Sequence, residues 1–195
     1  MALTEPTLNQ WLIQLLMLAF PALGAGVLHM AVVKWNIAPW LKKPLDGGYC
    51  WRGKRIFGDH KTYRGVIAMV LLSTLFCYLL MLLVHHSTFW QTYHLLEFDR
   101  YPPWFYGMIY GLAYTLSELP NSFIKRQQNI TPGNRGSVTN ILIDQSDSIV
   151  GCLLAIYPFV SISFTFILLG IIFLSVIHIV TNLLLFLLNL REQPL

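Results

Sequence analysis

Long apolar segments separated by short polar ones dominate the hydrophobic pattern of this chain. A helix needs about 20 predominantly apolar residues to cross the hydrocarbon core of a bilayer. Three segments reach this length without a Lys, Arg, Asp or Glu, and two weaker ones contain carboxylates. The pattern therefore predicts an all-α integral membrane protein, a single membrane domain of five transmembrane helices. The expected spans are residues 8–33, 66–84, 104–119, 141–160 and 162–190.

Composition points to the same class. Of the 195 residues, 55% are hydrophobic and only 11% are charged, and the mean hydropathy is +0.58. An ordinary soluble domain has about 25% charged residues, and a chain of this length is too short for several domains.

The basic residues fall unevenly between the connections. Residues 34–65 hold eight Lys or Arg against two acids, whereas the connection between the second and third spans holds one Arg against two acids. The positive-inside rule places 34–65 and 120–140 in the cytoplasm. The chain is then expected in the cell membrane, with its N-terminus outside and its C-terminus in the cytoplasm. The basic residues of the second cytoplasmic connection are Lys125, Arg126 and Arg135.

The first cytoplasmic connection ends in the run FGDHKTYRG, which mixes glycines with charge. Gly58 and Gly65 allow backbone amides to approach a ligand, while Lys61 and Arg64 supply positive charge. The run also leads into the N-terminus of the second span, where an anion such as phosphate is favoured. As an alternative, the connection is basic only because it determines the topology or because it contacts anionic headgroups.

Carboxylates are costly inside a membrane, so those near the ends of spans are functional candidates. Asp144 and Asp147, in the sequence DQSD, are spaced i, i+3 and share one helix face. They are candidate oxygen ligands for Mg²⁺ bound to the phosphates of a nucleotide. As an alternative, they are solvated at the membrane surface or paired with Lys125 and Arg126.

His178 and Asn182 share one face of the last span because they are four residues apart. A buried histidine is more often a packing residue than a ligand, so this pair counts only together with the other motifs.

The sequence shows no GxSxG motif and no Cys beside a His. A lipid phosphate can itself be the nucleophile, in which case the protein need only position it and neutralise charge.

In combination, these motifs resemble the CDP-archaeol synthases, which are relatives of the phosphatidate cytidylyltransferases. The resemblance rests on NIAPWLKKPLDGG, GKRIFGDHKTYRG, NSFIKR, DQSD and HIVTN, in the family's order and approximate spacing. It implies a five-span enzyme that uses CTP and Mg²⁺ to convert a lipid phosphate into a CDP-activated lipid, with release of pyrophosphate. The expected partners are CTP, the lipid phosphate and membrane lipids. Nucleic acid is not expected, and a homodimer is left open.

The resemblance also implies roles for particular residues. The expected catalytic residues are Asp59, Lys61, Arg64, Lys125 and Arg126. Binding of substrate or nucleotide, directly or by ordering the first connection, is expected for Asn36, Asp46, Gly58, Thr62, Ser122, His178 and Asn182. The expected Mg²⁺ ligands are Glu118, Asp144 and Asp147.

The chain departs from the family pattern at one motif. It has SELPNSF where archaeal members look like GDLVGSF, so Ser117 and Glu118 stand in place of a Gly–Asp pair. The longer Glu side chain leaves the identity of the lipid open. Two rival functions remain: a CDP-alcohol phosphotransferase, whose longer acidic signature is missing, and a non-catalytic scaffold that binds anionic lipid, which leaves the carboxylates unexplained.

Overall fold

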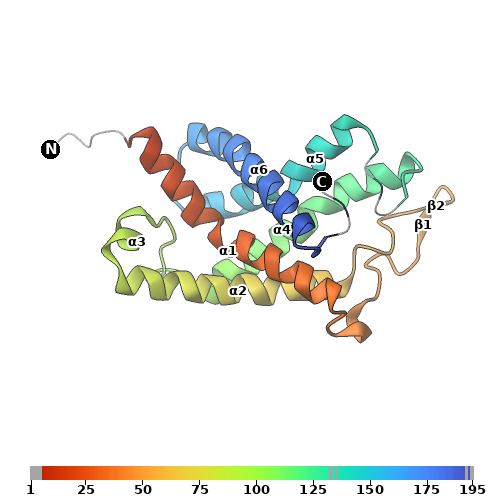
Figure 1. Cartoon of the computed structure of the whole chain (residues 1–195), viewed down its shortest axis with the longest axis horizontal. Helices are drawn as coiled ribbons and strands as arrows, with labels where there is room; N and C mark the ends of the chain where they lie inside the picture. Colours follow the sequence, from red (N-terminus) through yellow and green to blue (C-terminus); the bar gives the residue numbers. More distant parts are fainter. Residues whose placement is uncertain (1–5, 132–133, 135, 192, 194–195) are drawn as a thin grey trace.

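Five long helices make up most of the part of the chain that the computed structural model describes, residues 6–131, 134, 136–191 and 193. Arg135, counted above among the basic residues, lies outside this part. Figure 1 shows the short helix α3 at one end of the molecule and a small hairpin at the other, with α2 running between them. The long helices are α1 (Leu8–Lys34), α2 (Tyr63–His86), α4 (Pro103–Gln127), α5 (Val138–Ile156) and α6 (Phe164–Leu187).

Short elements connect the long helices. Helix α3 covers Thr88–Tyr93, and 3-10 turns cover Pro39–Leu41 and Tyr157–Phe159. Strands β1 (Cys50–Trp51) and β2 (Lys54–Arg55) pair antiparallel within the connection between α1 and α2. This hairpin was not anticipated, and apart from it the structure is all-helical as predicted.

Four helices in the described part of the chain are long and apolar enough to cross a membrane. They are α1, α2, α6 and α5 together with the turn that follows it, Val138–Phe159. Four of the five expected spans thus correspond to helices that could cross a membrane by length and composition. Helix α4 is equally long but less apolar, because Glu118, Asn121 and Lys125 lie in its final turns.

Helix α4 also continues beyond the expected span 104–119. The span was expected to end at residue 119 because residues 120–140 were assigned to a cytoplasmic connection. Instead the helix runs through Pro120, which removes one backbone N–H but does not stop the helix. As a result, Glu118, Ser122 and Lys125 share one face of α4.

Helices α2 and α4 pack so closely that the backbone of one contacts the backbone of the other at two glycines of α4. A Cβ atom added to Gly107 would lie 2.3 Å from Cα of Thr74, and one added to Gly111 would lie 2.4 Å from Cα of Val70. The two glycines stand one turn apart on the same face of α4. Small residues with this spacing let membrane helices pack closely.

The hydrophobic core lies toward the α3 end of the bundle. It includes Val84 at the end of α2 and Leu96 after α3, both buried. Tyr110 of α4 is also buried, and its hydroxyl donates a hydrogen bond of 2.7 Å to the carbonyl of Leu18 on α1. This bond satisfies a polar atom inside the apolar core. The core therefore closes one end of the bundle, and the opposite end carries a cavity.

We expect Gly111→Ala to destabilise the protein by about 2 kcal/mol, because the added methyl group would overlap the α2 backbone. The measurement is the thermal unfolding midpoint of purified protein in detergent. Gly26→Ala is the matched control, since its new Cβ would meet nothing closer than the Tyr114 hydroxyl at 3.8 Å. Equal midpoints for the two variants would contradict the close packing of α2 and α4.

Candidate active site

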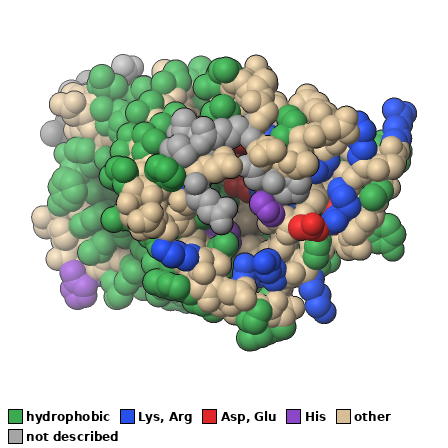
Figure 2. All heavy atoms as spheres, turned by 45° about the vertical axis from the view of Figure 1, so that its right-hand side comes forward, with side chains coloured by type: hydrophobic (Ala, Val, Ile, Leu, Met, Phe, Trp, Pro, Cys, Tyr) green, Lys and Arg blue, Asp and Glu red, His purple; other side chains and the backbone are tan. Residues whose placement is uncertain are grey.

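A cavity of about 1090 Å³ opens at the hairpin end of the bundle. All five long helices and the connection between α1 and α2 contribute to its walls. Figure 2 shows the hollow with Lys and Arg side chains gathered near it, whereas hydrophobic side chains cover most of the opposite end. The cavity thus joins the apolar interior to the most basic part of the surface.

Most of the residues singled out in the sequence come together in this cavity. Asn36, Asp46 and Gly58 do not line it. Those that do are Asp59, Lys61, Thr62, Arg64, Glu118, Ser122, Lys125, Arg126, Asp144, Asp147, His178 and Asn182.

The wall that α1 contributes changes from apolar to polar along its length. Ala19, Ala22 and Gly26 line the inner part and share one helix face. Toward the hairpin end the same wall carries His29 and Lys34. The cavity therefore has an apolar inner part and a polar outer part.

The Asp46 carboxylate organises the connection between α1 and α2. Its Oδ2 accepts hydrogen bonds from the amides of Phe57 and Gly58, both at 2.9 Å. Its Oδ1 accepts from the amide of Gly48 at 3.0 Å and from Arg55 Nη2 at 2.7 Å. Burial alone would raise the pKa of Asp46, but Arg55 and the amides hold that pKa well below its usual range. Asp46 and Gly58 thus shape the connection from outside the cavity.

Arg64 anchors the first turn of α2 to the end of α1. Its Nη1 donates to Oδ1 of Asn36 at 2.8 Å and to the carbonyl of Ile37 at 3.3 Å. Arg64 is buried, and its Nε has no hydrogen-bond partner among the described residues. Thr62 caps the same helix by accepting a hydrogen bond of 3.2 Å from the amide of Gly65. Asn36 therefore does not line the cavity but holds Arg64, which does.

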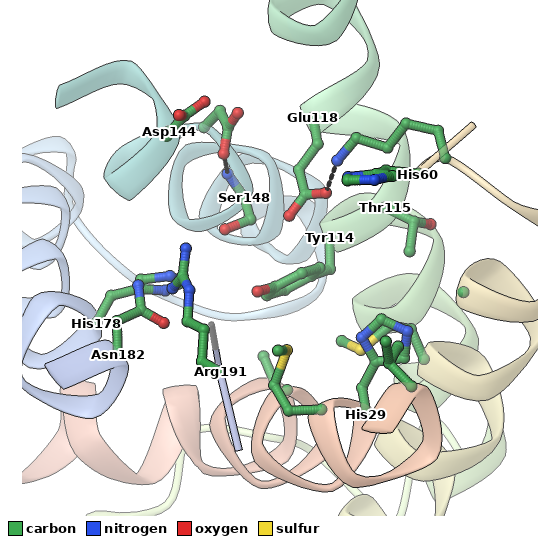
Figure 3. A pocket seen from close by; sticks show the side chains of 18 of the residues that line it. His29, His60, Tyr114, Thr115, Glu118, Asp144, Ser148, His178, Asn182 and Arg191 are labelled. Carbon is green, nitrogen blue, oxygen red and sulfur yellow. Dashed lines mark hydrogen bonds and ion pairs between the residues drawn. The ribbon is translucent and has the colours of Figure 1, made fainter. Parts of the chain in front are cut away.

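Lys61 and Glu118 form an ion pair that joins the connection to α4. Burial alone would lower the pKa of Lys61, but the Glu118 carboxylate raises it above its ordinary value, so the ammonium group stays charged. Figure 3 shows Glu118 reaching from α4 toward the cavity. Asp59, by contrast, is mostly exposed and pairs with Arg55 at 2.8 Å.

Asp144 and Asp147 face α4 from α5 and share one partner. The side-chain amide of Asn121 donates to Asp144 Oδ1 at 2.6 Å and to Asp147 Oδ2 at 3.0 Å. Asp144 also pairs with Lys125, and the Asp147 carboxylate accepts a hydrogen bond of 2.7 Å from the amide of Ser148. The i, i+3 spacing thus places both carboxylates on the cavity side of α5.

The carboxylates only partly match the predicted metal site. Asp144 and Asp147 supply hard oxygen donors close enough to share one amide group, a donor set that suits Mg²⁺. Glu118 lines the same cavity but is paired with Lys61. Within the described residues, no group of three His, Cys, Asp or Glu side chains is close enough to hold a metal ion. In this structure Glu118 pairs with Lys61 and Asp144 with Lys125, and the Asn121 amide bridges Asp144 and Asp147.

Arg126 is a buried cation with unused hydrogen-bond donors. It lies on α4 in the cavity wall, and its Nε and Nη1 have no acceptor in the described part of the chain. A buried guanidinium without an anionic partner is unfavourable, because its desolvation is not repaid. An anionic ligand in the cavity would relieve that cost.

His178 and Asn182 reach the cavity from α6, as Figure 3 shows. The Asn182 amide donates a hydrogen bond of 2.8 Å to Oε1 of Gln145 on α5, between the two aspartates in sequence. Sequence reasoning missed Gln145 and Asn121, although both lie inside motifs that it had singled out. It also missed His29, which stands in an apolar span with no motif around it.

Comparisons with known proteins agree with one another. A family model described as CarS-like CDP-archaeol synthase matches residues 33–195. The chain is 26% identical over 157 residues to the CDP-archaeol synthase of Thermofilum pendens, covering 80% of this chain and 67% of that protein. It is 34% identical to the CDP-archaeol synthase of Thermococcus kodakarensis, covering 62% and 64%, and 29% identical to that of Pyrobaculum arsenaticum, covering 90% and 92%.

A solved structure shares the fold. It is described as an intramembrane enzyme for archaeal membrane lipids biosynthesis, and it superposes with a TM-score of 0.57 at 20% sequence identity. The superposition covers 86% of this chain and 91% of that one. The bundle architecture is therefore shared with a known intramembrane enzyme.

We expect Asp46→Asn to loosen the connection between α1 and α2, because the substituted amide cannot accept all the hydrogen bonds that the carboxylate accepts. The measurement is the rate of trypsin cleavage within residues 42–55 at neutral pH, which should rise severalfold. Asp59→Asn is the matched control, since the side chain of Asp59 is 70% exposed and pairs only with the Arg55 side chain. Equal cleavage rates in the two variants would show that Asp46 does not organise this segment.

Proposed function

Because the chain belongs to the CarS-like CDP-archaeol synthase family, we propose that it is a CTP-dependent cytidylyltransferase acting on a membrane lipid phosphate. The product would be a CDP-activated lipid, and pyrophosphate would be released. The observation that carries the proposal is the buried Arg126, whose unused donors face a cavity that also holds carboxylates. Such a cavity suits a ligand that brings several phosphates.

The cations of the cavity would bind and neutralise the triphosphate. Arg64 and Arg126 offer unused guanidinium donors, which suit phosphate oxygens. Lys61 and Lys125 are held near the cavity by Glu118 and Asp144 in this structure. Phosphate oxygens could replace those carboxylates as partners of the two ammonium groups.

Asp144 and Asp147 would hold Mg²⁺, with Glu118 as the remaining predicted ligand. Protein sites for Mg²⁺ often use one or two carboxylates and complete the coordination with water and substrate phosphates. The absence of a three-carboxylate cluster among the described residues is compatible with such a site. When bound, the ion supplies positive charge to the phosphate oxygens of the nucleotide.

In the transfer itself, no protein side chain needs to form a covalent bond with a substrate. An oxygen of the lipid phosphate attacks the α-phosphorus of CTP, a new P–O bond forms, and the bond to the β-phosphate breaks. The nucleophile is already anionic, so no protein base is needed to activate it. The chain must hold the two phosphates in line and neutralise the leaving pyrophosphate, the task we assign to Lys61, Arg64, Lys125 and Arg126.

We also propose five spans, with α4 as the third, an outer N-terminus and a cavity that opens to the cytoplasm. The uneven distribution of basic residues supports this orientation. The polar turns of α4 would be tolerated because they face the cavity and not lipid. The site would then be accessible to cytoplasmic CTP.

The orientation predicts different labelling of two cysteines by a membrane-impermeant maleimide. Cys50 is exposed in the connection between α1 and α2, whereas Cys77 and Cys152 are buried. We expect Cys50 to react only after cells that express the chain are permeabilised. In a Cys50→Ser background, Asp99→Cys should react in intact cells. Reaction of Cys50 in intact cells would refute the proposed orientation.

The activity predicts pyrophosphate release from CTP only when Mg²⁺ and a lipid phosphate are both present. The measurement uses purified protein in detergent with three acceptors side by side: a diether glycerol phosphate, a diacylglycerol phosphate and a polyprenyl phosphate. The acceptor that is consumed identifies the substrate class. If CTP fails to bind and all three acceptors fail, the enzyme proposal falls and a non-catalytic membrane protein is favoured.

Matched variants extend the same assay to the carboxylates. We expect Asp144→Asn and Asp147→Asn each to lower kcat by at least about a hundredfold at saturating CTP, as for a lost metal ligand. Asp99→Asn is the control, because Asp99 is exposed and lies in the connection between α3 and α4. Near-normal turnover of well-folded Asp144 and Asp147 variants would remove these residues from the metal site.

A further inference from the structure

One polar side chain stands on the α1 wall between the apolar row and the end of the helix. His29 lies outside the matched region 33–195, so the family comparison assigns it no role. The cavity face of α1 is otherwise apolar from Leu18 to Val33. Figure 3 shows His29 pointing from α1 into the cavity, across from Asp144 and Glu118.

The imidazole of His29 faces the first turn of α2. Its Nε2 atom is buried and has no hydrogen-bond partner among the described residues. A Cβ atom added to Gly65 would lie 3.6 Å from this Nε2 and 3.7 Å from Oγ1 of Thr62. The charged groups that act on His29 are Glu118, Arg64 and Lys61. The ring therefore lies next to the cations that we expect to bind phosphate.

An unpaired buried nitrogen is unfavourable, because it has lost its hydrogen bonds to water without gaining others. A native structure that keeps such a group needs a reason for it, such as a catalytic role or a bound ion. As the Nε2–H tautomer, the imidazole can donate one hydrogen bond to an anionic oxygen. A phosphate oxygen beside Gly65 and Arg64 would accept it.

The position of His29 in the cavity indicates which phosphate this is. The apolar inner part, lined by Ala19, Ala22 and Gly26, suits hydrocarbon, and the cationic outer part suits a triphosphate. A lipid with its chains in the inner part would place its phosphate at the boundary between them. His29 is the first polar residue that α1 presents at that boundary.

We propose that Nε2 of His29 donates a hydrogen bond to the phosphate of the lipid substrate and so sets how deeply the lipid enters the cavity. The proposal rests on the proposed function. It makes His29 a positioning residue that distinguishes the lipid phosphate from the nucleotide. CTP would be held by the cations of α2, α4 and the connection before α2, and would not need this contact.

The experiment compares full-length His29→Ala and His29→Gln with wild type. It measures KM and kcat for CTP and for the lipid phosphate, with thermal unfolding as a check of folding. We expect His29→Ala to lower kcat/KM for the lipid phosphate by about tenfold to a hundredfold, the usual effect of losing a hydrogen bond to a charged group. The KM for CTP should stay within about twofold. His29→Gln should recover part of the loss, because its amide can donate from a similar position.

Two further variants test whether an effect of His29→Ala comes from the lost hydrogen bond and not from a change in the fold. Gly65→Ala leaves His29 intact but places a methyl group against Nε2 at ordinary contact distance, so it should also weaken use of the lipid phosphate. Alanine is well tolerated in a helix, and folding should be retained. His86→Ala removes an exposed histidine at the far end of α2 and should behave as wild type.

Direct binding separates a failure of this proposal from a failure of the proposed activity. Dioctanoylglycerol phosphate and CTP with Mg²⁺ are titrated separately into wild type and the variants in detergent, and no turnover is needed. Weaker binding of the lipid phosphate alone in His29→Ala and Gly65→Ala supports the proposal even if no acceptor is consumed. Weaker binding of CTP alone would assign His29 to the nucleotide and overturn the proposal, as would unchanged binding of both ligands.

Discussion

Charged groups at the end of an apolar helix bundle need partners, because water cannot fully solvate them there and burying an unpaired charge is costly. The rest of this structure depends on that constraint. Lys61 pairs with Glu118, and Lys125 pairs with Asp144, so each pairing joins two separate elements. At the opposite end the ion pair of Arg100 with Glu97 lies exposed within one connection, and glycine contacts and aromatic packing join the elements there.

This arrangement also explains how one small domain can combine a stable fold with a site for anions. The ion pairs keep the cavity formed, yet their partners can be exchanged because phosphate oxygens bind ammonium groups as carboxylates do. Nε and Nη1 of Arg126 have no hydrogen-bond partner among the described residues, so the site retains unused cationic donors. A ligand that brings phosphates completes a network that the chain leaves partly unsatisfied.

The sequence predicted the membrane class and the motifs well, because both depend on local composition. It missed features that depend on packing. The third span was expected to end at residue 119, but the helix continues through Pro120 to Gln127. Asp46, by contrast, was expected to bind substrate or order its connection, and its hydrogen bonds within the connection agree with the second alternative. His29 gave no signal because its surroundings in sequence are uniformly apolar. The cavity brings most candidate residues together, while their chemical roles stay predictions.

The row of small residues on α1 separates two properties of the cavity. Ala19, Ala22 and Gly26 line its inner part, while the charged groups of the outer part lie on other elements or, for Lys34, at the end of α1. A larger side chain in this row would narrow the inner part of the cavity without changing the charge of the outer part. Under the proposed function, tolerance for hydrocarbon shape and capacity for phosphate chemistry would therefore be encoded by different residues. Selection can alter the first while preserving the second, which would let related proteins diverge in membrane chemistry while keeping a common reaction.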